Sequence, residues 1–207
     1  IGYATKEDDR ETWRETLKRA EDNMYRSKLL GAKSYRSAIV TSIRNALFEK
    51  SHETEEHGQR LAAFSREIGK AMGLSSGQLD ELEVLAMLHD VGKIAIDDRI
   101  LQKPDVLTRT ELTELKRHPE IGYRIAQTVP ELMNIADYVL AHHERWDGKG
   151  YPRGLAGKDI PLLSRILAVV DAYDAMTQDR PYRKAGSVEA AKEELQKHAG
   201  TQFDPVI

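Results

Sequence analysis

The stretch that decides the fold runs from residue 75 to residue 93 and reads SSGQLDELEVLAMLHDVGK. Apolar residues recur at steps of three and four from Leu79 to Leu88, which predicts an amphipathic α-helix with serine caps at its start. The helix ends in His89 and Asp90, two polar residues that directly follow a buried apolar stripe. Because burial penalises such groups unless something compensates them, this helix end predicts a functional site.

Helical periodicity continues on both sides of this stretch and dominates the chain. It predicts helices over residues 11–30, 38–50, 53–72, 108–117, 130–143, 161–177 and 187–198, with another beginning at Pro119. Strand-like alternation is nearly absent, and its best candidates are residues 1–4 and 34–37. The segment between His143 and Pro161 is too rich in glycine and proline to be a helix, so we expect a functional loop there. The pattern as a whole predicts an all-α helical bundle.

Composition excludes several classes of protein. The 207 residues carry a formal net charge of −3, which excludes a protein that binds a nucleic-acid polymer through overall basicity. With no cysteine, the chain has no disulfide, thiolate metal site or cysteine nucleophile, so any metal must be held by histidine and carboxylate. We find no apolar run long enough to span a membrane and no export signal, and we expect a cytoplasmic location. Because the first residue is Ile1, we treat the chain as an excerpt of a longer protein.

Histidines and carboxylates recur at spacings that suit metal ligands. Glu53 and His57 lie four residues apart, so on a helix they project from one face. His142 and His143 end another buried helix, and Asp171 lies within a helix that is apolar on nearly every side. A buried carboxylate without compensation would cost several kcal/mol, and a divalent cation is the natural compensation.

Each of these residues also has an ordinary structural explanation. Glu53 could line a solvated helix face, and Lys93 could be an exposed lysine after a helix end. Asp171 could pair with Arg165 or Arg180. Taken together, however, imidazole and carboxylate groups on several separate helices favour a multinuclear site for hard or borderline metals. Residue chemistry alone leaves the two explanations open.

Longer motifs resemble a known family. His89-Asp90 followed by Gly92-Lys93 is the signature of the HD superfamily of metal-dependent phosphohydrolases. Residues 142–152 read HHERWDGKGYP, which closely resembles the HD-GYP domain and its Gly-Tyr-Pro loop. The match continues through DAYDAMT at residues 171–177, DRPYR at 179–183 and GTQFDP at 200–205. The resemblance covers about residues 40–207 and implies an HD-superfamily helical bundle.

The first thirty-six residues resemble a different module. IGYA at residues 1–4, AEDNMYRSK at 20–28 and Gly31 are similar to the last strand and helix of a GGDEF domain. The GGDEF signature itself is missing, so no cyclase activity is expected, and a plain amphipathic linker helix remains the alternative. We therefore expect a GGDEF-like remnant and N-terminal helical segment over residues 1–36 and an HD-GYP domain over 37–207. Truncation of that domain at its C-terminus is left open.

The HD-GYP resemblance implies a metal-dependent phosphodiesterase that hydrolyses cyclic di-GMP to linear pGpG and on to GMP. It implies two or three divalent metal ions, iron or manganese. The ligands carried over are Glu53, His57, His89, Asp90, His118, His142, His143 and Asp171. The catalytic positions are Asp90 and Lys93, and the positions that contact the nucleotide are Lys93, Gly150, Tyr151, Asp174, Arg180 and Arg183. We expect three ions because Glu53 could reach an ion beside His57.

Two alternatives to this function stay open at this stage. The chain could sense a nucleotide without cutting it, although the ligand set is intact. It could also hydrolyse another cyclic dinucleotide. Cyclic di-GMP is the expected small-molecule partner, while a homodimer and an upstream GGDEF or sensor domain are left open.

Overall fold

A computed structural model describes residues 12–13, 16, 39–51, 54–179 and 184–207. Contacts divide the chain into two units, Ile1–Ile43 and Arg44–Ile207. Apart from residues 12, 13 and 16, the predicted helix over 11–30 and the GGDEF-like segment lie outside the described residues, as do both strand candidates. In the second unit, the described residues form helices and loops and no strand.

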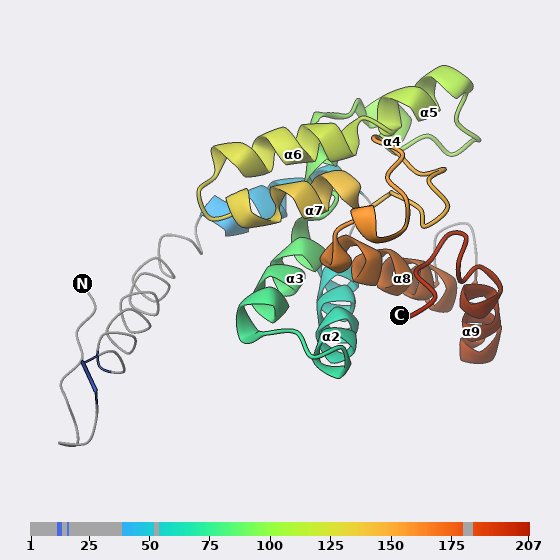
Figure 1. Ribbon diagram of the computed structural model, residues 1–207. Helices are drawn as coiled ribbons and strands as arrows, with labels where there is room; N and C mark the ends of the chain where they lie inside the picture. The colour runs from blue at the N-terminus through green and yellow to red at the C-terminus, as the bar shows by residue number, and fades with distance from the viewer. Residues whose placement is uncertain (1–11, 14–15, 17–38, 52–53, 180–183) are drawn as a thin grey trace. The chain divides into compact units, whose positions relative to one another are not determined.

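The structure confirms the all-α prediction (Figure 1). After a helix over residues 39–50, the elements are α2 (Glu55–Ala71), α3 (Ser76–Leu88), the 3₁₀ helix η1 (Val91–Ala95), α4 (Asp98–Leu101), α5 (Arg109–Leu115), α6 (His118–Thr128), η2 (Met133–Ile135), α7 (Ala136–Ala141), η3 (Gly157–Asp159), α8 (Leu162–Thr177) and α9 (Val188–Lys197). None of the helices in the described part of the chain is both long and apolar enough to cross a membrane.

Local signals fix where several helices begin. Ser75 caps α3 by accepting a hydrogen bond from the backbone N–H of Gln78, whose side chain accepts one in return from the backbone of Ser75. Thr108 and Glu111 form the same reciprocal box at the start of α5, as their spacing predicts. Helix α2 begins at Glu55, later than predicted, because Thr54 is its cap.

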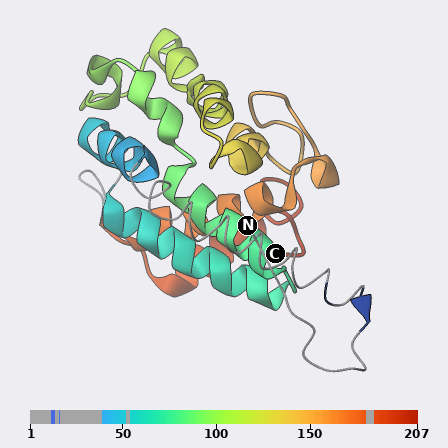
Figure 2. The same cartoon turned by 90° about the vertical axis from the view of Figure 1, so that its left-hand side faces the viewer.

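The core lies where α2, α3 and α8 pack together. Helix α2 contacts both α3 and α8, while α6 packs against α7 and η1 (Figures 1 and 2). Leu61, Leu82, Leu85 and Ile166 are completely buried where these helices meet. This packing brings the ends of α3 and α7 and the start of α6 toward α2 and α8, so polar residues from distant parts of the sequence can share one site.

One predicted helix is divided in the structure. The apolar pattern predicts a helix over residues 130–143, but the chain forms η2 and then the short helix α7. Over a single turn, apolar residues at i and i+3 suit a 3₁₀ helix as well as an α-helix, so periodicity does not separate the two. The division does not displace His142, which still follows α7 directly.

Candidate metal and catalytic site

Three histidines at helix ends are oriented by the backbone. His89 follows α3, His118 begins α6 and His142 follows α7. In each, Nδ1 lies within 3.1, 2.8 and 2.6 Å, respectively, of the carbonyl oxygen three residues earlier. Because a carbonyl oxygen only accepts, Nδ1 is the donor in each of these contacts, and Nε2 is the ring nitrogen left to face the site. This arrangement is typical of histidines that bind metal through Nε2.

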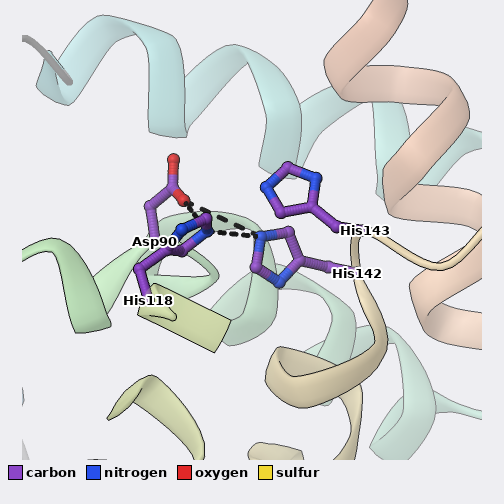
Figure 3. A group of neighbouring side chains, drawn as sticks. All are labelled: Asp90, His118, His142 and His143. Carbon is purple, nitrogen blue, oxygen red and sulfur yellow. Dashed lines mark hydrogen bonds and ion pairs between the residues drawn. The ribbon is translucent and has the colours of Figure 1, made fainter. Parts of the chain in front are cut away.

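Asp90, His118, His142 and His143 form the first candidate ligand group (Figure 3). Asp90 Oδ1 lies 3.0 Å from His118 Nε2 and 3.7 Å from His142 Nε2, and the two Nε2 atoms are 3.2 Å apart. Asp90 Oδ1 is buried and accepts no hydrogen bond from the described residues. Lone pairs that converge at these distances repel one another unless a cation lies among them, so the group fits a divalent metal ion.

A second candidate group lies beside the first. It consists of His57 on α2, His89 and Asp171 on α8, with His57 Nε2 3.7 Å from Asp171 Oδ1. The other oxygen of Asp90, Oδ2, lies 3.3 Å from His89 Nε2. Asp90 therefore presents one carboxylate oxygen to each group, as a ligand shared by two ions would.

The electrostatics of the first group favour the protonation states that metal ligands need. Burial alone would raise the pKa of Asp90, but Lys93 and the surrounding histidines together hold that pKa well below its ordinary value. Burial lowers the pKa of His142, and burial together with the His142 ring lowers that of His143 well below its usual range. An ionised carboxylate beside neutral imidazoles can bind a cation without first losing protons.

Close backbone packing places Asp90 beside His118. Gly92 in η1 faces α6 so closely that a Cβ there would lie 1.9 Å from the carbonyl oxygen of His118 and 2.6 Å from the nitrogen of Gly122. A side chain at residue 92 would therefore push α6 away from η1. The glycine of the His-Asp-x-Gly-Lys pattern thus has a structural role that its spacing alone does not reveal.

His57 is oriented by the buried carboxylate of Asp174, which also forms an ion pair with Arg60. Its Nδ1 lies 2.7 Å from Asp174 Oδ2, and Arg60 donates to both Asp174 oxygens at 2.6 and 3.0 Å. Burial would raise the pKa of Asp174, but the hydrogen bonds from His57 and Arg60 lower it to about 2. The predicted contact of Asp174 with a nucleotide stays a prediction. The sequence analysis did not identify Arg60. The signal that could have indicated it is its position one turn after His57 on α2.

A second buried carboxylate holds the loop after His143. Glu144 is 4 % exposed and accepts hydrogen bonds from the backbone nitrogens of residues 153, 154 and 155 at 2.7, 3.1 and 3.0 Å. Sequence reasoning did not single out Glu144. Its carboxylate fixes the loop relative to the histidine pair that precedes it.

The same loop places the aromatic ring of Tyr151 against the candidate metal ligand His143. Tyr151 stacks on His143 with ring centroids 4.8 Å apart and an angle of 27° between the planes. A Cβ at Gly150 would lie 2.4 Å from the nitrogen of Arg145 and 2.5 Å from Cα of Glu144. Gly150 thus allows the chain to pack closely against its own backbone, and its predicted contact with the nucleotide stays a prediction.

Residues of both ligand groups line one cavity of about 260 Å³. Its lining residues are Asp90, Lys93, Leu112, Leu115, Lys116, His118, His143, Tyr151 and Asp171. Lys93 is not an ordinary exposed lysine: its side chain is 19 % exposed, and Nζ lies 2.6 Å from Asp90 Oδ2. The cavity therefore combines candidate metal ligands, a cation and an aromatic ring.

The structure brings together most of the predicted site. Seven predicted ligands fall into the two groups, and Lys93 and Tyr151 line the cavity beside them. Glu53, Arg180 and Arg183 lie outside the described residues. The alternative that Asp171 pairs with Arg165 is not what the structure shows, since Arg165 pairs with Asp204.

Comparisons with known proteins find relatives for most of this chain. A family model described as "HD domain" matches residues 41–207. A cyclic di-GMP phosphodiesterase of Thermotoga maritima is 42% identical over 171 residues, which are 81% of this chain and 46% of that protein. The 3'3'-cGAMP-specific phosphodiesterase 2 of Vibrio cholerae is 38% identical over 171 residues, 82% of this chain and 33% of that protein. This chain thus spans less than half the length of these two curated relatives.

Two solved structures share the fold. A cyclic GMP-AMP-specific phosphodiesterase of V. cholerae, V-cGAP3, has a TM-score of 0.61 and 23% identity, covering 82% of this chain and 46% of that one. Bd1817 of Bdellovibrio bacteriovorus, described as an HDG"Y"P protein, has a TM-score of 0.57 and 18% identity, covering 94% of this chain and 71% of that one. At these identities the likeness concerns the fold alone.

Proposed function

The chain belongs to the HD domain family, and we propose that it hydrolyses cyclic di-GMP with two or three divalent ions, iron or manganese. The observation that carries this proposal is the pair of ligand groups joined by the two oxygens of Asp90. The name of the T. maritima relative supports the choice of substrate. The products proposed are linear pGpG and then GMP.

The ligand residues fit the metals that such a reaction needs. Asp90, His118, His142 and His143 would hold one ion, and His57, His89 and Asp171 would hold another. Divalent ions bound there would lower the pKa of a water molecule and neutralise charge on the phosphate. The donors are oxygen and nitrogen atoms, a mixture that suits iron or manganese.

The chain's own residues supply the rest of the chemistry. Lys93 directs its ammonium group into the cavity beside Asp90, where it can stabilise negative charge that develops on the phosphoryl oxygens. Lys93 does not need to donate a proton for this role. Tyr151 lines the cavity and offers its ring and hydroxyl group beside a guanine base.

A third ion and the nucleotide contacts remain part of the proposal. Glu53 immediately precedes the cap of α2 and would add a carboxylate near His57. Arg180 and Arg183 would bind the nucleotide by charged hydrogen bonds. Metal stoichiometry in the wild type and in Glu53→Ala, prepared identically without oxygen, tests the third ion. A fall from three ions to two supports it, and two ions in both proteins contradicts it.

Hydrolysis of a mixed cyclic dinucleotide is the second candidate function. The V. cholerae relative that is named for 3'3'-cGAMP favours it, because that protein covers most of this chain. The metal ligands act on a phosphodiester and do not themselves distinguish guanine from adenine. We also keep as proposals an HD-GYP domain over residues 37–207, a GGDEF-like remnant before it, a cytoplasmic location and a homodimer.

One experiment tests the proposed function directly. The chain is purified without oxygen, its metal content is measured, and chromatography follows the products from cyclic di-GMP and 3'3'-cGAMP. We expect bound metal and conversion of cyclic di-GMP to pGpG. Faster turnover of 3'3'-cGAMP would favour the second candidate. Binding of both nucleotides without cleavage, in protein supplied with manganese or ferrous iron, would overturn hydrolysis and leave a sensing role.

A further inference from the structure

Lys116 is a second lysine that lines the cavity, and neither of the candidate ligand groups nor the role proposed for Lys93 involves it. It follows α5 directly, its side chain is exposed, and it lines the same cavity as Asp90 and Tyr151. Its Nζ lies 5.0 Å from the centroid of the Tyr151 ring, over the face. Lys116 thus belongs to the wall of the cavity rather than to the outer surface of α5.

The charge of Lys116 is available to a ligand. Within the part of the chain that the structure describes, no carboxylate forms an ion pair with Lys116. Lys93 in the same cavity is paired with Asp90 at 2.6 Å, and the neighbouring Arg117 is paired with Glu114 at 2.9 Å. Of these three cations, Lys116 alone combines a place at the cavity with a charge that no described carboxylate neutralises.

The proposed substrate has a second negative group for such a cation. A cyclic dinucleotide carries two phosphodiesters, and only one of them can be at the shared metal ligands during cleavage. The second lies on the same small ring of atoms and must also be accommodated near the cavity. Because the ring of Tyr151 contacts both His143 and Lys116, a nucleotide held beside Tyr151 would come within reach of the ammonium group.

We propose that Lys116 is a specificity-determining residue that binds the phosphodiester that is not being cleaved. This inference rests on the proposed function. An oxygen of this phosphodiester would accept a charge-assisted hydrogen bond from the ammonium group of Lys116. A substrate can form that bond only if it has a second phosphate. Lys116 thereby favours a dinucleotide over a substrate with one phosphodiester.

The test compares Lys116→Ala with the control Arg117→Ala, which removes the same charge one residue away, outside the cavity lining. For cyclic di-GMP we expect KM to rise about tenfold or more in Lys116→Ala with little change in kcat, because a charged hydrogen bond is lost. Hydrolysis of bis(p-nitrophenyl) phosphate, which has a single phosphodiester, should not change. Lys116→Arg should restore most of the affinity, and Arg117→Ala should behave like the wild type.

A binding measurement on protein treated with EDTA separates this proposal from the proposed function. The dissociation constant for cyclic di-GMP should rise about tenfold in Lys116→Ala. Equal dissociation constants in the wild type and Lys116→Ala would overturn the role of Lys116. An equal loss on bis(p-nitrophenyl) phosphate would also overturn it, because it would indicate a structural role through Tyr151. A wild type that binds cyclic dinucleotides but cleaves none would instead overturn the proposed function alone.

Discussion

Replacement of Glu144 by glutamine tests whether one buried carboxylate holds the loop that carries Tyr151. Glu144 Oε1 accepts from the backbone nitrogens of Arg153 and Gly154, and Oε2 accepts from that of Leu155. Glutamine keeps the shape of the side chain but has a single acceptor oxygen. The least costly orientation of the glutamine side chain places its amide nitrogen at the Oε2 position. The hydrogen bond from Leu155 is then lost, and the amide N–H of glutamine faces the backbone N–H of Leu155.

The free energy of unfolding should fall by about 2–4 kcal/mol, because a hydrogen bond to a charged group is lost and a buried N–H is left without an acceptor. For a chain of this size, 1 kcal/mol shifts Tm by about 2–4 °C, so Tm should fall by roughly 4–16 °C. Thermal unfolding followed by circular dichroism measures the shift. Glu193→Gln, an exposed substitution within α9, is the matched control and should leave Tm nearly unchanged. Equal Tm values for Glu144→Gln and the wild type would refute the reasoning.

Two further substitutions test how the ligands are positioned. Asp174→Asn should weaken Mn²⁺ binding about 10–100-fold, because an amide has one acceptor oxygen and cannot accept from both Arg60 and His57 as the carboxylate does. Titration that shows unchanged affinity would mean that His57 does not need Asp174 to bind metal. Gly92→Ala should lower the free energy of unfolding by about 3 kcal/mol in urea, because its Cβ would meet the backbone of His118. Gly77→Ala, where a Cβ meets nothing within 4 Å, is the control, and a similar loss there would contradict the packing argument.

Short-range features of the fold could be predicted from the sequence. The capping box at Thr108 and Glu111 involves partners three residues apart, so a few neighbouring letters contain the whole interaction. The periodicity of α8 likewise indicates a helix buried on most sides, and Asp171 within it suggested compensation by a cation. The site residues were carried over from a resemblance. The structure then showed that they form two groups joined by Asp90.

Interactions between distant residues could not be predicted in this way. Arg60 and Asp174 are 114 residues apart, and no pattern in either segment indicates that they pair. The bonds from Glu144 to the backbone depend on the path of the loop, and any acidic residue there would have looked the same in the sequence. In the sequence, Lys116 looks like any other exposed lysine. Its proposed role depends on the cavity, which residues from other elements also line.

The two oxygens of Asp90 are proposed to join two metal positions in one reaction centre. The most direct measurement is the metal content of Asp90→Ala, prepared without oxygen beside the wild type, together with cyclic di-GMP hydrolysis at saturating Mn²⁺. We expect loss of metal from both positions and loss of hydrolysis, with an unchanged helical circular dichroism spectrum. Hydrolysis at the wild-type rate in Asp90→Ala would contradict the shared role of this carboxylate.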